Sequence, residues 1–114
     1  MKTILLVNGF DLSMLNGNPT VRFQKMTLEE VKKGIAEYKP VSTIVSAEYA
    51  ELLSKELGIY ITPSIRKPEM NFNTSLLIAD IKTKSGSKPR IVLGELQKDL
   101  IIEWWFAYET LPVD

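Results

Sequence analysis

Apolar positions in the first half of the chain occur in short runs that predict strands. Residues 4–7 form a continuous apolar run, which is typical of a buried central strand. Residues 20–25 alternate apolar and polar side chains, which fits a strand with one wet face. Between them, the apolar positions in residues 10–15 indicate a short helical turn.

Two helices follow from spacing and end signals. Thr27 and Glu30 have the spacing of a capping box, and apolar residues then recur at helical intervals until Pro40. Residues 41–45 are rich in β-branched side chains and predict the next strand. The helix after that strand is expected to end at Gly58, which supplies a left-handed C-terminal residue.

The second half of the chain predicts shorter and more varied elements. They are a short strand at 59–61, a loosely held loop at 63–73, a strand at 76–81 that is apolar on both faces, a glycine- and lysine-containing turn at 83–89, a strand at 90–93, about two turns of helix at 94–100, and an aromatic strand at 103–110. Strands and helices therefore mix along residues 1–114. The predicted fold class is α/β: one domain with a mixed sheet of about five strands flanked by helices.

Composition excludes several kinds of chemistry. The chain has no cysteine and no histidine, so the sequence predicts no thiolate metal site and no imidazole acid, and we expect no metal and no cofactor. Fourteen basic and fourteen acidic residues balance, which argues against binding to duplex nucleic acid. No apolar run is long enough to span a membrane, and we expect a cytoplasmic protein.

Charge and aromatic residues are unevenly distributed. Six of the fourteen basic residues cluster in one quarter of the sequence: Arg66, Lys67, Lys82, Lys84, Lys88 and Arg90. They indicate either a soluble hairpin tip or a surface for a small anion. Trp104 and Trp105 are expected on opposite faces of the final strand, one in the core and the other against solvent, a helix or another chain. The alternatives for this second tryptophan are nucleic-acid stacking and an oligomer contact. The contact is favoured, because tryptophan anchors interfaces and no basic residue flanks the run, and it indicates a homodimer.

The junction between the strand at 41–45 and the following helix is the best candidate binding position. A helix N-terminus presents free N–H groups and a positive dipole end, which suit an anion. Ser46 is typical of an N-cap residue, and Glu48 carries negative charge where the dipole favours it, so both also have a purely structural explanation.

In order along most of its length, the sequence resembles the small viral ring nucleases, a family of type III anti-CRISPR proteins. The resemblance rests on the first strand running into Asn8-Gly9-Phe10, then Pro19-Thr20, the capped helix at Thr27, residues 50–54 of the next helix, and the aromatic final strand. It implies a homodimer whose subunits enclose cyclic tetra-adenylate. It also implies metal-free cleavage, with a ribose hydroxyl attacking the phosphate and a histidine protonating the leaving oxygen.

The residues that the resemblance assigns to cleavage differ in this sequence. Ser46 stands where the family has its catalytic histidine, and a general acid is typically worth about 10²–10⁴ in rate. The family's arginine and glutamate have lysines nearby instead, at Lys84 and Lys88, and Asp11 replaces a serine. The sequence therefore predicts the binding frame without the cleavage chemistry, and no catalytic residue is assigned.

Three functions remain open. The first is binding of a cyclic oligoadenylate or related cyclic oligonucleotide at a dimer cleft with weak or no cleavage, which would counteract or modulate nucleotide-signalled defence. The second is an active metal-independent ring nuclease using other residues, and the third is a protein-interaction scaffold of viral or mobile-element origin. The predicted ligand-binding residues are Asn8, Phe10, Asp11, Ser46, Ala47, Glu48, Lys84 and Lys88.

Overall fold

Strand β1 (Thr3–Val7) lies inside a mixed sheet, with parallel neighbours on both sides. In the computed structural model, residues 3–86 and 100–110 are described, and the strand order is β2-β5-β4-β1-β3. The other strands are β2 (Thr20–Met26), β3 (Val41–Ser42), β4 (Thr74–Thr83) and β5 (Leu100–Thr110). β1 is parallel to β3 and β4, whereas β5 is antiparallel to β4 and β2. The predicted α/β class with a five-stranded mixed sheet is confirmed.

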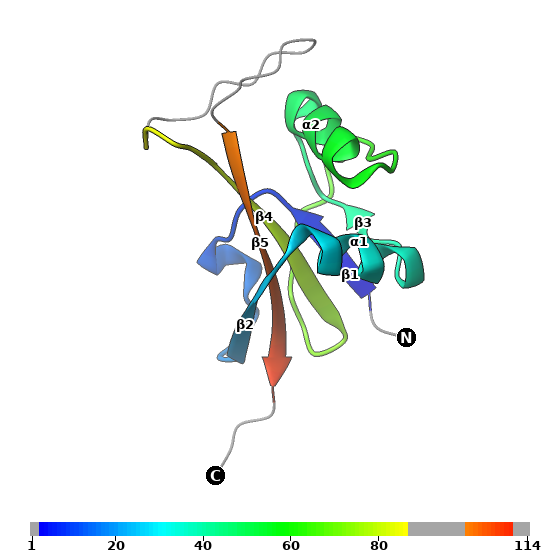
Figure 1. Ribbon diagram of the computed structural model, residues 1–114. Coiled ribbons are helices and arrows are strands. Elements are labelled where there is room, and N and C mark those ends of the chain that lie inside the picture. Colours follow the sequence, from blue (N-terminus) through cyan, green and yellow to red (C-terminus); the bar gives the residue numbers. More distant parts are fainter. Residues whose placement is uncertain (1–2, 87–99, 111–114) are drawn as a thin grey trace.

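Helices α1 (Leu28–Glu37) and α2 (Ala47–Leu57) cover the same face of this sheet (Figure 1). The capping box of α1 is complete, because the Glu30 N–H donates to Thr27 Oγ1 at 3.2 Å and the Thr27 N–H donates to Glu30 Oε1 at 3.0 Å. α2 ends at Gly58 with φ of 70°. Both predicted helices and both end signals are confirmed.

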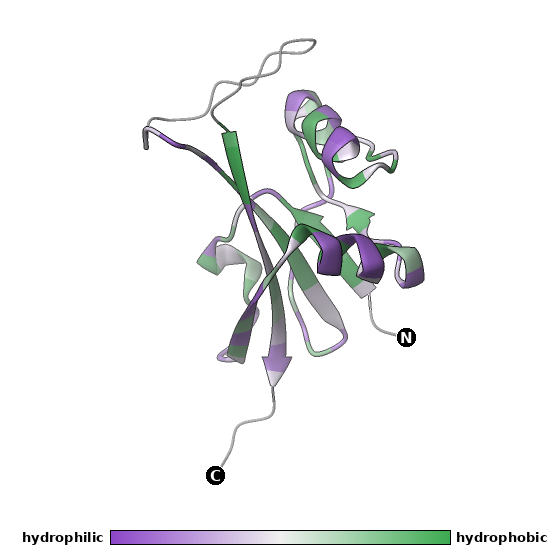
Figure 2. Ribbon diagram, in the orientation of Figure 1, coloured by the Kyte–Doolittle hydropathy of each residue, from purple (hydrophilic) through white to green (hydrophobic). Residues whose placement is uncertain are grey.

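The sheet separates two hydrophobic cores because side chains alternate along each strand. The first core lies under the helices and contains Leu6, Leu77, Ala79, Trp104 and the buried residues of α1 and α2. The second core lies on the opposite face and contains Leu5, Val7, Met70, Leu76, Ile78 and Ala107. The predicted helical turn, η1 (Leu12–Met14), and its flanking residues cover that face. Figure 2 shows the central strands as largely hydrophobic between these layers.

The strand predicted at 41–45 is only two residues long, and no strand forms at 59–61. The pairing of β3 with β1 ends at Ser42 and Leu6, and beyond it the Thr43 N–H and hydroxyl both donate to the Leu6 carbonyl, at 3.0 and 2.8 Å. At 59–61, the Ile61 N–H donates to Ser54 Oγ of α2 at 2.9 Å and therefore not to a strand.

The loop at 63–73 is more firmly held than its composition indicates. Met70 is fully buried in the second core, and its N–H donates to the Met14 carbonyl at 2.7 Å. The Ser64 N–H donates to the Ile44 carbonyl at 2.8 Å. Both bonds connect the loop to segments distant in sequence, which local composition does not reveal.

The aromatic strand β5 begins at Leu100, three residues before the predicted start, so Leu100 extends a strand and does not end a helix. The predicted strand at 90–93 and the rest of the predicted helix lie outside the described residues. Trp104 is 3% exposed in the first core, and Trp105 is partly buried on the opposite face. The predicted division of the two tryptophans between faces is therefore confirmed.

Candidate functional site

The carboxyl ends of β1 and β3 lie side by side at one end of the sheet, and we term the position between them the crevice, after the corresponding position in open α/β sheets. After β1 the chain passes to the second core, where Phe10 and Met14 pack. After β3 the chain enters α2, which packs on the first core through Ala50 and Leu53. The connections after these two adjacent parallel strands therefore go to opposite faces of the sheet. Open α/β sheets bind their ligands at such a position.

Three predicted residues lie on the β1 side of this crevice. Asn8 is exposed directly after the strand. Phe10 turns toward the second core, where its ring packs edge-on against Phe23 with centroids 5.1 Å apart. Asp11 is exposed and caps η1, accepting from the Ser13 N–H at 2.8 Å; this bond lowers the pKa of Asp11. Asn8 and Asp11 are accessible to a ligand, whereas Phe10 faces away from α2.

The other side of the crevice is the N-terminus of α2. Ser46 is the N-cap residue, and its Oγ accepts from the Tyr49 N–H at 3.3 Å. The same hydroxyl donates to Glu48 Oε2 at 2.8 Å. The pKa of Glu48 lies below its ordinary value because its own backbone N–H and the Ser46 hydroxyl donate to its carboxylate. Ala47 is exposed beside them.

Glu48 therefore holds a carboxylate where an anionic ligand was predicted to bind. Negative charge in the first turn of a helix is favoured by the dipole, so the protein satisfies this helix end with its own side chain. A phosphate that approaches the N–H groups has to displace Glu48. The structure thus brings Ser46, Ala47 and Glu48 together as predicted and adds a competing charge.

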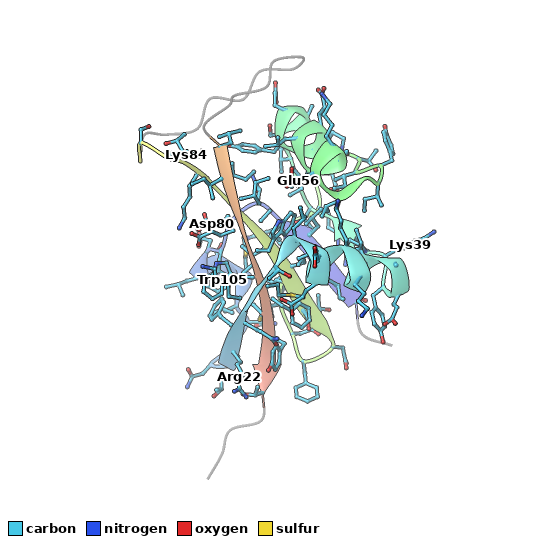
Figure 3. All side chains as sticks on the ribbon, in the orientation of Figure 1. Arg22, Lys39, Glu56, Asp80, Lys84 and Trp105 are labelled. Carbon is cyan, nitrogen blue, oxygen red and sulfur yellow. The ribbon has the colours of Figure 1, made fainter. Side chains whose placement is uncertain are left out.

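Lys84 lies on an extension of the sheet and not at the crevice. Val7 at the end of β1 pairs with Ile78, and β4 continues beyond it with β5 as a two-stranded ribbon. Lys84 is six residues beyond Ile78, so it lies roughly 20 Å further along the strand direction at about 3.3 Å per residue. Figure 3 shows it near the tip of this ribbon, well away from Asp80 and Trp105. Lys88 lies outside the described residues.

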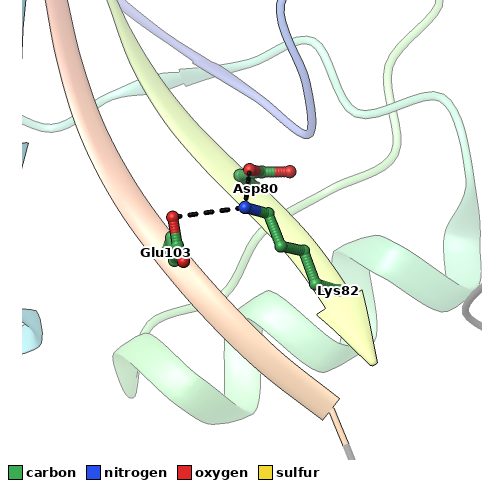
Figure 4. A network of polar contacts seen from close by, with 3 residues as sticks. All are labelled: Asp80, Lys82 and Glu103. Carbon is green, nitrogen blue, oxygen red and sulfur yellow. Dashed lines mark hydrogen bonds and ion pairs between the residues drawn. The ribbon is translucent and has the colours of Figure 1, made fainter. Parts of the chain in front are cut away.

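The sequence identified Lys82 as part of a basic cluster but did not predict its two acidic partners. Lys82 Nζ lies 3.2 Å from Asp80 Oδ2 and 3.4 Å from Glu103 Oε2 (Figure 4). The pKa of Lys82 is raised because Asp80 and then Glu103 accept hydrogen bonds from its ammonium. Alternation along 78–82 places Asp80 and Lys82 on one face, but only the strand register brings Glu103 opposite Asp80.

Two cavities flank the sheet. One, of about 490 Å³, opens between α1 and the first core face and is lined almost wholly by apolar residues, including Val31, Tyr38 and Phe106. The other, of about 460 Å³, lies on the second core face beside Phe10 and Asp80. Of these two cavities, only the second is lined by a predicted ligand-binding residue, Phe10, and by a carboxylate, that of Asp80.

Within residues 3–86 and 100–110, no group of three or more acidic side chains is placed to hold a metal ion. None of the helices in that part of the chain is long and apolar enough to cross a membrane.

The fold defines a class, that of small single-domain α/β proteins with a five-stranded mixed sheet. A solved structure with a similar fold is B116 of Sulfolobus turreted icosahedral virus, with a TM-score of 0.74 and 16% sequence identity. The similarity covers 93% of this chain and 98% of the viral chain. At this identity the similarity establishes a shared fold. No protein-family model and no curated protein sequence matches the chain.

Proposed function

We propose that this protein binds a cyclic oligoadenylate or a related cyclic oligonucleotide and cleaves it slowly or not at all. The observation that carries the proposal is the crevice between β1 and β3, with exposed Asn8 on one side and the α2 N-terminus on the other. Such an edge suits phosphate groups, since backbone N–H groups point out of it. The shared fold with a viral protein supports the further proposal of a viral origin and of a role against nucleotide-signalled defence.

The hydrogen bonding of Ser46 supports binding without cleavage. Its hydroxyl proton is directed to Glu48 Oε2, and its oxygen accepts from the Tyr49 N–H. A hydroxyl in this arrangement is a structural N-cap and supplies no proton to a departing ribose oxygen, for which enzymes use a group with a pKa near the working pH. The chain also has no histidine to take this role.

The ribbon of β4 and β5 supports a homodimer. Residues 79–83 of β4 pair with β5 alone among the described strands, and residues 100–103 of β5 pair with β4 alone. A two-stranded ribbon is marginally stable by itself, and its open edges are templates for pairing. A second copy that covers this ribbon would lie beside Lys84, and we propose that Lys84 reaches the ligand across the dimer.

The test is a thermal-shift assay with cyclic tetra-adenylate, followed by chromatography of the bound nucleotide. Binding without cleavage predicts a raised melting temperature and recovery of the intact ring. The double change Lys84→Ala, Lys88→Ala is expected to weaken binding about tenfold or more, since each lysine would lose a charge-assisted contact with phosphate. The control Lys32→Ala, Lys33→Ala makes the same charge change on the exposed face of α1.

Other outcomes would overturn the proposal in distinct ways. Rapid metal-free formation of linear product would identify an active ring nuclease. No thermal shift with any cyclic nucleotide would leave the protein-interaction scaffold as the function. If solution scattering showed that the protein is a monomer, a binding cleft between two subunits would be excluded.

A further inference from the structure

The cavity on the second core face has the composition of a site for a flat ring. Its lining, which we term the aromatic pocket, consists of Gly9, Phe10, Phe23, Ile78, Asp80 and Trp105. Three of the six lining residues are aromatic, and they come from three separate segments of the chain. The pocket has a volume of about 460 Å³, which is enough for a nucleobase or a nucleoside.

The rings are held in place but remain accessible. Phe10 and Phe23 meet edge to face at 87°, with centroids 5.1 Å apart. Phe23 is 45% exposed, and Trp105 is only partly buried, unlike Trp104 on the opposite face. Pre-positioned aromatic faces that reach solvent are the platforms on which bases stack, and each stacked base strengthens binding appreciably.

Asp80 supplies an oriented acceptor at the edge of the aromatic pocket. Lys82 Nζ binds Asp80 Oδ2 at 3.2 Å and is itself anchored by Glu103. Figure 4 shows the carboxylate fixed from this one side. Among the hydrogen bonds and ion pairs of the described residues, none occupies Asp80 Oδ1. That oxygen can accept a hydrogen bond from an amino group on a ring stacked in the pocket.

Charge around the aromatic pocket is balanced, which favours a neutral ligand over a cation. Asp80 and Glu103 are offset by Lys82, and Lys25 Nζ lies 5.8 Å from the centroid of the Trp105 ring. A cage for a permanent cation would combine its rings with an uncompensated carboxylate. Here a cation would meet two ammonium groups already in place.

Gly9 leaves one wall of the aromatic pocket without a side chain. Its φ is not positive, and a Cβ built on it would meet nothing within 4 Å. The fold itself therefore does not require a glycine at this position. A glycine in the wall of a pocket allows close approach of a ligand to the backbone.

We propose that the aromatic pocket binds a nucleobase that carries an exocyclic amine, stacked on the aromatic rings with its amine donating to Asp80. This proposal rests on the proposed function. It places one base of the cyclic oligonucleotide in the aromatic pocket, next to the residues that follow β1. Adenine, cytosine and guanine carry an exocyclic amine and uracil does not, so uridine is the nucleoside that lacks this donor.

Fluorescence of Trp105 tests this with nucleosides, which have no phosphate and so do not depend on the crevice. Adenosine and cytidine are expected to quench the emission in a saturable way, and uridine to bind about tenfold more weakly. In Trp105→Phe, the remaining emission comes from the buried Trp104 and should not respond. Asp80→Asn should reduce the preference for adenosine over uridine about tenfold, because an amide no longer offers a charged acceptor.

Phe23→Ala keeps the test decisive if the tryptophan variant does not fold, because Phe23 is half-exposed on β2 and its removal should weaken adenosine binding. Tyr60→Ala, at a residue 86% exposed in a loop, is the matched aromatic control and should leave binding unchanged. Absence of saturable quenching, or equal quenching by all three nucleosides that Asp80→Asn does not alter, would overturn the proposal. Adenosine binding without retention of cyclic tetra-adenylate would keep the pocket and reject the proposed function. Retention of cyclic tetra-adenylate without nucleoside binding would support the proposed function and reject the pocket.

Discussion

Ser46 and Glu48 form a closed pair at the start of α2, in which the serine hydroxyl donates to the Glu48 carboxylate at 2.8 Å. The same oxygen of Ser46 caps the helix through the Tyr49 N–H. This pair fills the helix end that an anionic ligand would otherwise use. The protein therefore carries its own competitor for phosphate at the crevice.

Glu48→Gln is accordingly expected to strengthen binding of cyclic tetra-adenylate about two- to fivefold, the range of a single charge near a helix terminus. The gain should shrink as salt rises, since screening weakens the repulsion that was removed. Isothermal titration at two ionic strengths measures both effects. Glu51→Gln is the control, because Glu51 lies in the next turn and pairs with Lys55 at 3.1 Å. Unchanged affinity in Glu48→Gln would show that the ligand does not contact this helix end.

Ser54→Ala is expected to destabilise the fold by about 1–3 kcal/mol, the cost of leaving a buried donor unsatisfied. The Ser54 hydroxyl accepts from the Ile61 N–H at 2.9 Å, and Ile61 is buried in the first core. Urea unfolding measures the change. Ser13→Ala removes an exposed serine hydroxyl and should have little effect; equal losses in the two variants would contradict this role for Ser54.

Two glycines should respond to alanine with opposite signs. Gly34 lies inside α1, and a Cβ there meets nothing within 4 Å, so Gly34→Ala should stabilise the protein by about 0.8–1 kcal/mol. Gly58 has a left-handed φ of 70°, so Gly58→Ala should destabilise it by about 1–2 kcal/mol. Thermal unfolding followed by circular dichroism compares the pair directly. If Gly34→Ala were less stable than the wild type, the cavity between α1 and the first core would have to be narrower than the structure shows.

Acid should weaken the fold partly through Glu30. Its pKa is lowered from the ordinary value of 4.5 because the Thr27 N–H and hydroxyl stabilise the carboxylate. Since the folded state binds this proton less readily, the contribution is present above pH 4.5 and is lost as pH falls through the lowered pKa. The difference in melting temperature between wild type and Glu30→Gln should thus be constant near neutral pH and shrink as the pH falls below 4.5. A constant difference into strong acid would contradict this assignment.

Local sequence signals predicted those elements whose ends are determined by nearby residues. Thr27 and Glu30 reach one another within a single helical turn, and Gly58 adopts its φ in the chain segment where it stands. The sequence did not predict where a strand stops for want of a partner. β3 ends at Ser42, where its pairing with β1 stops at Leu6, and β5 begins at Leu100, opposite Thr83 at the end of β4.

The same distinction holds for the candidate site. Asn8, Ser46 and Glu48 were predictable because each stands directly after a strand or at a helix start. The aromatic pocket and the Asp80–Lys82–Glu103 network were not, because they join residues from different strands through register.

The sequence by itself determined the apolar periodicities, the helix caps and the absence of histidine and cysteine, since these depend only on residue type and spacing. Tertiary structure alone decided that Lys84 lies on an extended ribbon, and that Phe10, Phe23 and Trp105 share one pocket. The physical reason is that contacts between distant segments depend on strand order and pairing register. A shift of one residue in register would move every side chain of a strand to the other face.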